Sequence, residues 1–238
     1  MDKNLDYLNP SCPWSSFEPA VDPFCEQRLC GWISEPANAW TNLAYILVGL
    51  VILYIICKKP EDAHFRTFGI LAILVGIGSG LLHGTGTWIG SMLDLSAMYF
   101  FSSYLVALAA RRAFKFSEAF FWTFYLLLCV LSVAIYFNFR FLALHVFGGE
   151  LAIWILLDLF ANWHIWRVNR PQLKYLYCTS VFFVVAFGVW QLDTRKIWCD
   201  ANNHAFNGHA AWHLINCFCY YFLYRYYRQF RELAKDTL

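Results

Sequence analysis

Three histidines, one aspartate and one serine interrupt the apolar segments of this sequence at regular spacings. Ser79 precedes His83 by four residues, Asp94 follows in the next segment, and His209 precedes His213 by four. Side chains four residues apart on a helix project from the same face, so each pair points in one direction. Three neutral imidazoles form the ligand set of a catalytic zinc site whose fourth position is left for water. This pattern therefore favours a hydrolytic zinc site.

The aspartate and the serine can supply what the three histidines lack. A zinc ion lowers the pKa of its bound water and polarises a carbonyl group. Asp94 can orient that water or shuttle its proton, and the Ser79 hydroxyl can donate to a developing oxyanion. We therefore assign catalytic roles to Ser79 and Asp94, and metal ligation to His83, His209 and His213.

Each of these residues also has an ordinary structural explanation when it is taken alone. A histidine pair at the end of a membrane helix is often interfacial. Ser79 can bond back to the carbonyl of Val75, and Asp94 can pair with a neighbouring helix or a loop amide. The convergence of all five residues on one face is the argument for a functional site.

The composition is that of an integral membrane protein. Of the 238 residues, 60% are hydrophobic and only 14% are charged, which is too little polar surface for a soluble domain. Seven apolar segments of 16–21 residues can be read, each about long enough to cross a bilayer as a helix. The predicted fold is an all-α bundle of seven transmembrane helices near Asn38–Cys57, Phe68–His83, Ser91–Ala110, Ala119–Phe137, Phe141–Ala161, Leu176–Leu192 and His209–Tyr226.

The distribution of lysine and arginine predicts the orientation of these helices. The less basic side carries Lys3, Arg28, Arg140, Arg195 and Lys196. The more basic side carries Lys58, Lys59, Arg66, Arg111, Arg112, Lys115, Arg167, Arg170, Lys174, Arg225, Arg228, Arg231 and Lys235. Because the more basic side of a membrane protein is cytoplasmic, the N-terminus is predicted outside and the C-terminus inside. The basic residues are topology signals and not a nucleic-acid surface.

This orientation brings all five candidate residues to the outer membrane face. The second segment runs outward, so His83 lies at its outer end, while the third and seventh segments begin outside. The predicted organisation is an external segment 1–36, a seven-helix membrane hydrolase domain 37–228 and a cytoplasmic tail 229–238. The external segment shows no signal-peptide pattern, so the first helix is expected to direct insertion.

Two carboxylates and four cysteines are candidates for other roles. Glu150 and Asp158 lie inside the fifth segment, where a carboxylate serves either a proton path or interhelical hydrogen bonds. The outer side carries cysteines that can form disulfides, although the sequence leaves their pairing open. These are Cys12, Cys25, Cys30 and Cys199.

The order and spacing of the candidate residues resemble the CREST superfamily of membrane hydrolases, and in particular its alkaline ceramidase branch. Phe24-Cys25-Glu26 is similar to the family's Trp-Cys-Glu, and Glu35, Asn38 and Asn42 keep its Glu-x2-Asn-x3-Asn spacing. The family's His-Ala-x-Trp-His is matched by His209-Ala210-Ala211-Trp212-His213, and its stretch before the last helix resembles Leu192-Asp193 followed by Cys199. The similarity extends over residues 24–213.

The resemblance implies a role for each matching residue. The three histidines would hold zinc, Asp94 would serve the zinc-bound water and Ser79 the oxyanion. Cys25 and Cys199 would form an external disulfide. Family members also bind Ca²⁺ in the N-terminal segment, but here Pro23 and Arg28 replace two of the ligands. A cation is unfavourable beside Ca²⁺, which argues against calcium here.

The same N-terminal residues leave two alternatives open. Glu26, Arg28, Glu35 and Asn38 form either a second cation site or its remnant, in which Arg28 bridges the two glutamates in place of the metal.

The predicted function is that of a zinc-dependent membrane amidase that cleaves the N-acyl bond of a ceramide-like lipid on the non-cytoplasmic side. One alternative is an acyl-ester lipid hydrolase of the same superfamily. Another is a heptahelical receptor or lipid-binding protein with structural zinc, and a transporter is a weaker alternative motivated by Glu150 and Asp158. The expected partner is a membrane lipid and not a nucleic acid.

The predicted orientation can be tested with a tag fused after Leu238. We expect an antibody to reach this tag only after the cells are permeabilised, because the positive-inside rule places the C-terminus in the cytoplasm. Labelling of the tag on intact cells would contradict the orientation, whereas a tag before Met1 should be labelled there.

Overall fold

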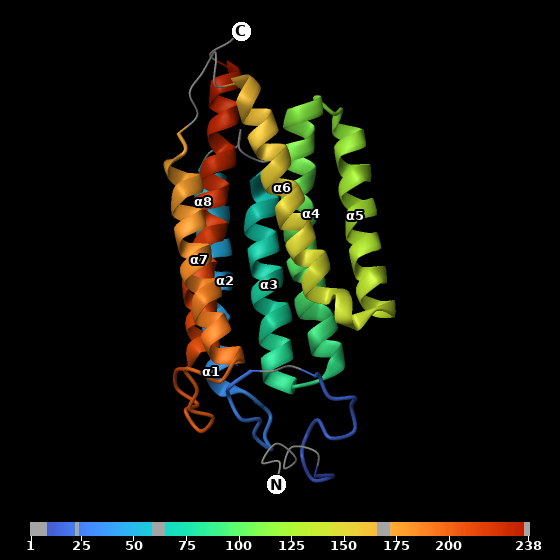
Figure 1. Ribbon diagram of the computed structural model, residues 1–238, viewed down its shortest axis with the longest axis vertical. Coiled ribbons are helices and arrows are strands. Elements are labelled where there is room, and N and C mark those ends of the chain that lie inside the picture. Colours follow the sequence, from blue (N-terminus) through green and yellow to red (C-terminus); the bar gives the residue numbers. More distant parts are fainter. Residues whose placement is uncertain (1–8, 22–23, 59–64, 166–171, 236–238) are drawn as a thin grey trace. The chain divides into compact units, whose positions relative to one another are not determined.

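The computed structural model describes residues 9–21, 24–58, 65–165 and 172–235, the side chains of 164–165 and 231–235 excepted (Figure 1). Several residues used above lie outside this part of the chain. They are Pro23 of the calcium comparison and the basic residues Lys3, Lys59, Arg167 and Arg170, and the side chains of Arg231 and Lys235 are likewise not described.

The described chain is helical. Two helices, α1 (Pro36–Thr41) and α2 (Leu43–Cys57), fall in the first predicted segment, followed by α3 (Arg66–Thr85) and α4 (Trp88–Phe114). The next elements are α5 (Glu118–Asn138), the short 3-10 helix η3 (Arg140–Leu142) and α6 (Ala143–Ile165). The last two are α7 (Lys174–Thr194) and α8 (Gly208–Lys235). The predicted all-α class is confirmed.

Six helical stretches are long and apolar enough to cross a membrane, which fits a multi-pass membrane protein. They run over Pro36–Cys57, Arg66–Thr85, Trp88–Phe114, Glu118–Asn138, Arg140–Trp163 and Lys174–Thr194. The seventh predicted segment is also helical, as part of α8, but this helix is less apolar because it carries two histidines at its start and Arg225 and Arg228 in its second half. A seventh crossing and the orientation of the termini stay predictions.

The chain divides into two compact units. The first combines Met1–Asp94 with Leu173–Arg228, and the second combines Leu95–Gln172 with Gln229–Leu238. All five candidate residues belong to the first unit, as do Cys12, Cys25, Cys30 and Cys199. The candidate site can therefore be described within that unit alone.

Within the first unit, α8 packs against three other helices. Its Tyr220 ring lies 5.4 Å from Tyr45 of α2, and its Tyr227 ring lies 5.8 Å from Phe68 of α3. On another side, Phe218 lies 5.1 Å from Phe182 of α7. These aromatic contacts fix α8 beside α2 and α3, which is the arrangement that its two histidines need.

Two glycines allow α2 and α3 to pack with their backbones in contact. A Cβ atom at Gly49 would lie 2.5 Å from the carbonyl oxygen of Gly69, and one at Gly69 would lie 2.8 Å from that of Gly49. Small residues permit this close packing between membrane helices. The position of α3, and of the histidine near its end, therefore depends on these glycines.

The N-terminal segment lies along the end of α3. The amides of Ser34 and Glu35 donate to the carbonyls of Gly84 and His83 at 2.8 and 2.9 Å. Gly86 ends the helix in the left-handed conformation, with φ 64°, and its carbonyl accepts from Ala20 at 2.9 Å. These bonds fix Glu35 beside His83.

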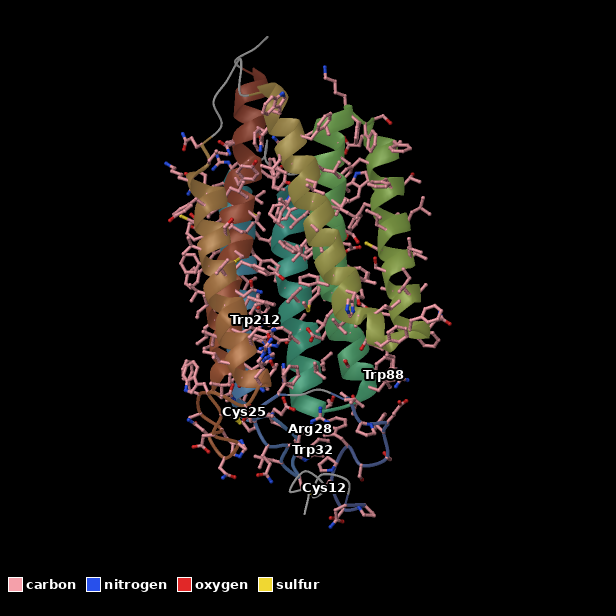
Figure 2. All side chains as sticks on the ribbon, viewed as in Figure 1. Cys12, Cys25, Arg28, Trp32, Trp88 and Trp212 are labelled. Atoms are coloured by element: carbon pink, nitrogen blue, oxygen red, sulfur yellow. A yellow bond between two sulfur atoms is a disulfide. The ribbon has the colours of Figure 1, made fainter. Side chains whose placement is uncertain are left out.

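Two disulfides fix the N-terminal segment, with S–S distances of 2.01 Å for Cys12–Cys30 and 2.05 Å for Cys25–Cys199. The first lies within the N-terminal segment, and the second joins this segment to the loop between α7 and α8. Figure 2 shows Cys12, Cys25 and Arg28 on the N-terminal segment beyond the ends of α3 and α8. The sequence had left open the pairing of Cys12 and Cys30.

The second unit contains the two carboxylates of the fifth predicted segment. Glu150 of α6 accepts hydrogen bonds from Ser103 of α4 at 2.8 Å and Ser132 of α5 at 2.6 Å, and also from Ser102. Asp158 pairs with Arg112, and Asn162 donates to it at 2.9 Å. These contacts match the interhelical alternative.

The α2–α3 contact can be tested by the change Gly49→Ala. The added methyl group meets a backbone carbonyl that cannot rotate away, so we expect a loss of about 1–3 kcal/mol in the free energy of unfolding. Gly188→Ala on α7 is the matched control, because a Cβ atom there meets nothing within 4 Å and alanine favours a helix. Thermal unfolding in detergent measures both. A Gly49→Ala midpoint equal to that of the unchanged protein would contradict this packing.

Candidate metal centre

The three predicted ligand histidines come together in the first unit. One nitrogen from each of His83, His209 and His213 lies within 4.8 Å of the others. The Nε2 atoms of His83 and His209 are 3.1 Å apart. The three rings are only 1%, 4% and 2% exposed in sequence order. Helix α3 supplies the first histidine and the first two turns of α8 supply the other two.

His83 is oriented by a buried carboxylate. Its Nδ1 lies 2.6 Å from Glu35 Oε2. Burial raises the pKa of a carboxyl, but the hydrogen bond to His83 and the charge of Arg28 hold the pKa of Glu35 below its usual range. An ionised carboxylate can only accept, so Nδ1 of His83 carries the proton and Nε2 presents its lone pair to the centre.

His213 is oriented in the same way by a hydroxyl group. Its Nδ1 lies 2.9 Å from Thr41 Oγ1. The hydroxyl hydrogen of Thr41 is directed to the carbonyl of Ala37 at 2.9 Å, so Oγ1 accepts the Nδ1 proton of His213. The hydrogen-bond network therefore assigns an unprotonated Nε2 to His213 as well.

The first turn of α8, which carries His209, is fixed by Asp193. Its Oδ2 accepts from the amide of His209 at 3.0 Å and its Oδ1 accepts from the amide of Cys25 at 2.9 Å. One carboxylate thus binds the start of α8 and the N-terminal segment together. Asn207 adds a cap, because its Oδ1 accepts from the amide of Ala210 at 2.8 Å.

The arrangement fits a divalent metal ion. His83 and His213 each present an unprotonated Nε2 to the group, and one nitrogen from each of the three rings lies within 4.8 Å of the others, close enough for a single ion to bind all three. Buried neutral imidazoles suit zinc, although they also suit other transition metals. The three imidazole donors thus support a metal centre but do not by themselves identify the metal.

The structure places Ser79 at the centre and Asp94 on the neighbouring helix. Ser79 Oγ lies 3.5 Å from His213 Nε2. A Cβ atom at Gly78 would lie 3.1 Å from Asp94 Cα, so the start of α4 packs on α3 next to Ser79. The catalytic roles of both residues stay predictions.

The oxygens of the proposed second cation site are held by protein donors. Glu26 accepts from the amides of Ala37 and Asn38, both at 2.9 Å, and therefore caps the short helix α1. Arg28 Nε donates to Glu35 Oε1 at 3.0 Å, and Asn38 Nδ2 donates to Glu35 Oε2 at 3.1 Å. Of the two alternatives, these contacts fit a remnant of a cation site in which Arg28 takes the place of the metal ion. Arg28 contacts Glu35, whereas its predicted contact with Glu26 stays a prediction.

Several residues that shape the centre carry no role in the sequence prediction. They are Phe24, Thr41, Asp193 and Asn207. The Nδ1 atom of His204, in the loop before α8, lies 3.0 Å from Glu26 Oε1, and Asn207 Nδ2 donates to Glu26 Oε2 at 3.3 Å. Phe24 and Asp193 belong to two of the short sequence stretches, Phe24-Cys25-Glu26 and Leu192-Asp193, on which the family resemblance rests. Thr41 gave no signal, because its partner is 172 residues away in the sequence.

Comparison with known protein families gives one match, to a family model described as Ceramidase, over residues 20–237. The match contains every residue of the candidate centre. A search of curated protein sequences found no similar protein.

The assignment of the ring nitrogens predicts the effect of Thr41→Val. This change removes the acceptor of the His213 Nδ1 proton while keeping the side-chain volume, and loss of such a partner weakens metal binding by roughly 10–100-fold. Thr194→Val is the matched control, since Thr194 makes the same backbone bond four residues back, at 3.1 Å, on α7. Competition with a zinc chelator measures both affinities. Equal affinities would contradict the role of Thr41.

Proposed function

This chain belongs to the ceramidase family, and from that premise we propose that it is a zinc-dependent integral membrane amidase that hydrolyses the N-acyl bond of ceramide-like lipids. The observation that carries the proposal is the buried group of His83, His209 and His213. Two of its rings present unprotonated Nε2 atoms to one point. Apolar helices that contain such a centre can admit a lipid from the membrane.

The number of protein ligands supports a catalytic role for the metal. Structural zinc sites are closed by four protein ligands, whereas catalytic sites use three and leave a position open. The group of metal-binding side chains in the described part of the chain has three members. This favours an enzyme over a receptor with structural zinc.

The chain's own residues have distinct parts in the proposed reaction. Zinc, when bound, lowers the pKa of a water molecule and polarises the substrate carbonyl. Glu35 and Thr41 hold the histidine rings in place. Asp94 accepts the proton of the attacking water and returns it to the leaving nitrogen. The Ser79 hydroxyl, beside His213 Nε2, donates to the oxygen on which negative charge develops.

The net reaction uses one water molecule. The carbonyl carbon forms a bond to the water oxygen and breaks its bond to nitrogen, which takes up a proton. The products are a fatty acid and a sphingoid base. We place this chemistry on the non-cytoplasmic side, because the positive-inside rule puts the end of α3 and the start of α8 there.

The same centre can cleave an acyl ester, so the amide preference needs a direct test. Purified protein should be given a labelled ceramide, and a phospholipid with the same labelled acyl chain. Faster release of the chain from ceramide supports the amidase. Faster release from the phospholipid would favour the ester hydrolase, and release from neither would favour a receptor or lipid-binding protein.

The role of Asp94 predicts that Asp94→Asn retains zinc and the fold but loses hydrolysis by roughly 10²-fold or more, because the amide side chain cannot accept the proton of water. Asp200→Asn is the matched control, since Asp200 is exposed in the loop before α8. Metal content and turnover are measured on the same preparations. Unchanged turnover of Asp94→Asn would remove this residue from the mechanism.

A separate change tests the serine. Ser79→Ala is expected to cost roughly 10²-fold in turnover if its hydroxyl stabilises the oxyanion. Ser180→Ala on α7 is the control, because the Ser180 hydroxyl bonds to the Leu176 carbonyl at 3.0 Å on an exposed face. Equal turnover in the two variants would contradict the role of Ser79.

A further inference from the structure

His209 is held differently from the other two histidines of the centre. His83 and His213 each place Nδ1 against an oxygen, on Glu35 and Thr41. The Nδ1 atom of His209 is buried and, among the described residues, has no hydrogen-bond partner. A ligand histidine normally owes its orientation to such a partner, so something else must orient this ring.

The ring of Phe24 lies against His209. The two ring centroids are 4.0 Å apart and the planes are tilted by 39°. The same phenyl ring lies 5.0 Å from the ring of His83. At these distances an aromatic pair restricts both the position and the tilt of its members. Phe24 therefore contacts two of the three rings, those whose Nε2 atoms are 3.1 Å apart.

Phe24 itself is fixed on both sides of the backbone. Its carbonyl accepts from the ammonium group of Lys196. The next residue, Cys25, donates its amide to Asp193 and forms the disulfide with Cys199. The Asp193 carboxylate thus binds both the backbone next to Phe24 and the backbone of His209, so one residue positions the phenyl ring and the histidine.

On its other side Phe24 faces an outer cavity of about 500 Å³. Its lining includes Arg28, Glu35, Lys196 and Cys199, whereas none of the three histidines lines it. The lining combines charged groups with apolar surface, so it can hold water. The phenyl ring is shared between this cavity and the histidine centre.

We propose that Phe24 is a positioning residue of the metal centre: its ring holds His209 in the ligating orientation in place of a polar partner at Nδ1, and it closes the centre toward the outer cavity. The proposal rests on the proposed metal-dependent function. It assigns the outer cavity as the aqueous side from which water and the metal ion reach the histidines. The lipid then approaches from another side.

The experiment compares three changes at Phe24. Phe24→Trp keeps an aromatic face, Phe24→Leu keeps apolar bulk without it, and Phe24→Ala removes both. Phe17→Ala is the matched control, because Phe17 is in the same segment and packs against Trp14 at 6.1 Å. For each zinc-loaded protein, the rate of zinc transfer to a water-soluble chelator is measured. Cobalt-substituted protein reports the ligand geometry through its visible absorption spectrum.

We expect Phe24→Ala to release zinc at least about 10-fold faster, in line with the loss of an orienting partner. Phe24→Leu should still close the metal centre toward the cavity, so zinc release stays slow, but the cobalt spectrum should change. Phe24→Trp should resemble the unchanged protein in both the release rate and the spectrum. The Phe17→Ala protein should match the unchanged protein. Release rates and spectra that do not differ between Phe24→Ala and Phe17→Ala would overturn the proposal.

A second measurement does not depend on bound metal. In metal-free protein, a water-soluble reagent that acylates histidine, diethylpyrocarbonate, should modify His209 about 10-fold faster in Phe24→Ala than in Phe17→Ala, as read by peptide mass spectrometry. If the unchanged protein holds no zinc, the proposed function fails while this measurement still tests Phe24. If the protein holds zinc and His209 is modified equally in both variants, the role of Phe24 fails alone. Thermal unfolding and intact Cys25–Cys199 confirm that each variant is folded.

Discussion

The candidate centre depends on the contact between the Glu35 carboxylate and the His83 ring, at 2.6 Å. A buried carboxylate is stable only when its oxygens are bonded and its charge is balanced. Here Arg28, Asn38 and His83 bond to its two oxygens, and the amide of Glu35 bonds to the carbonyl of His83. The same residue therefore orients a ligand and fastens the N-terminal segment to α3.

The remaining parts of the centre are built on that support by other buried carboxylates. Glu26 caps α1 through two amides, which places Thr41 at the end of this helix within reach of His213. Asp193 joins Cys25 to the start of α8. Each carboxylate links the N-terminal segment to a helix of the first unit. The N-terminal segment is thus a structural component of the centre, although it lies outside the apolar helices.

Buried polar groups in the second unit have a different purpose. Glu150 accepts hydrogen bonds from serine hydroxyls of two neighbouring helices, and Asp158 pairs with Arg112. In an apolar environment such bonds fix which helices pair and in which register. The sequence marked Glu150 and Asp158 as unusual, but only the structure identifies the interhelical contacts that they make.

The sequence by itself determined the helical membrane class and the three histidines. Both follow from short-range patterns: long apolar segments, and pairs of residues four apart that must share a helix face. The family pattern also pointed to the bond between Cys25 and Cys199. Only the tertiary structure decided which residues orient the rings, because Thr41 and His213 are 172 residues apart and Asp193 acts through backbone amides that no side-chain pattern records. The contact of Phe24 with His209 has the same origin. It exists because a disulfide and a shared carboxylate bring the N-terminal segment onto the start of α8, and local residue spacing carries no information about that long-range contact.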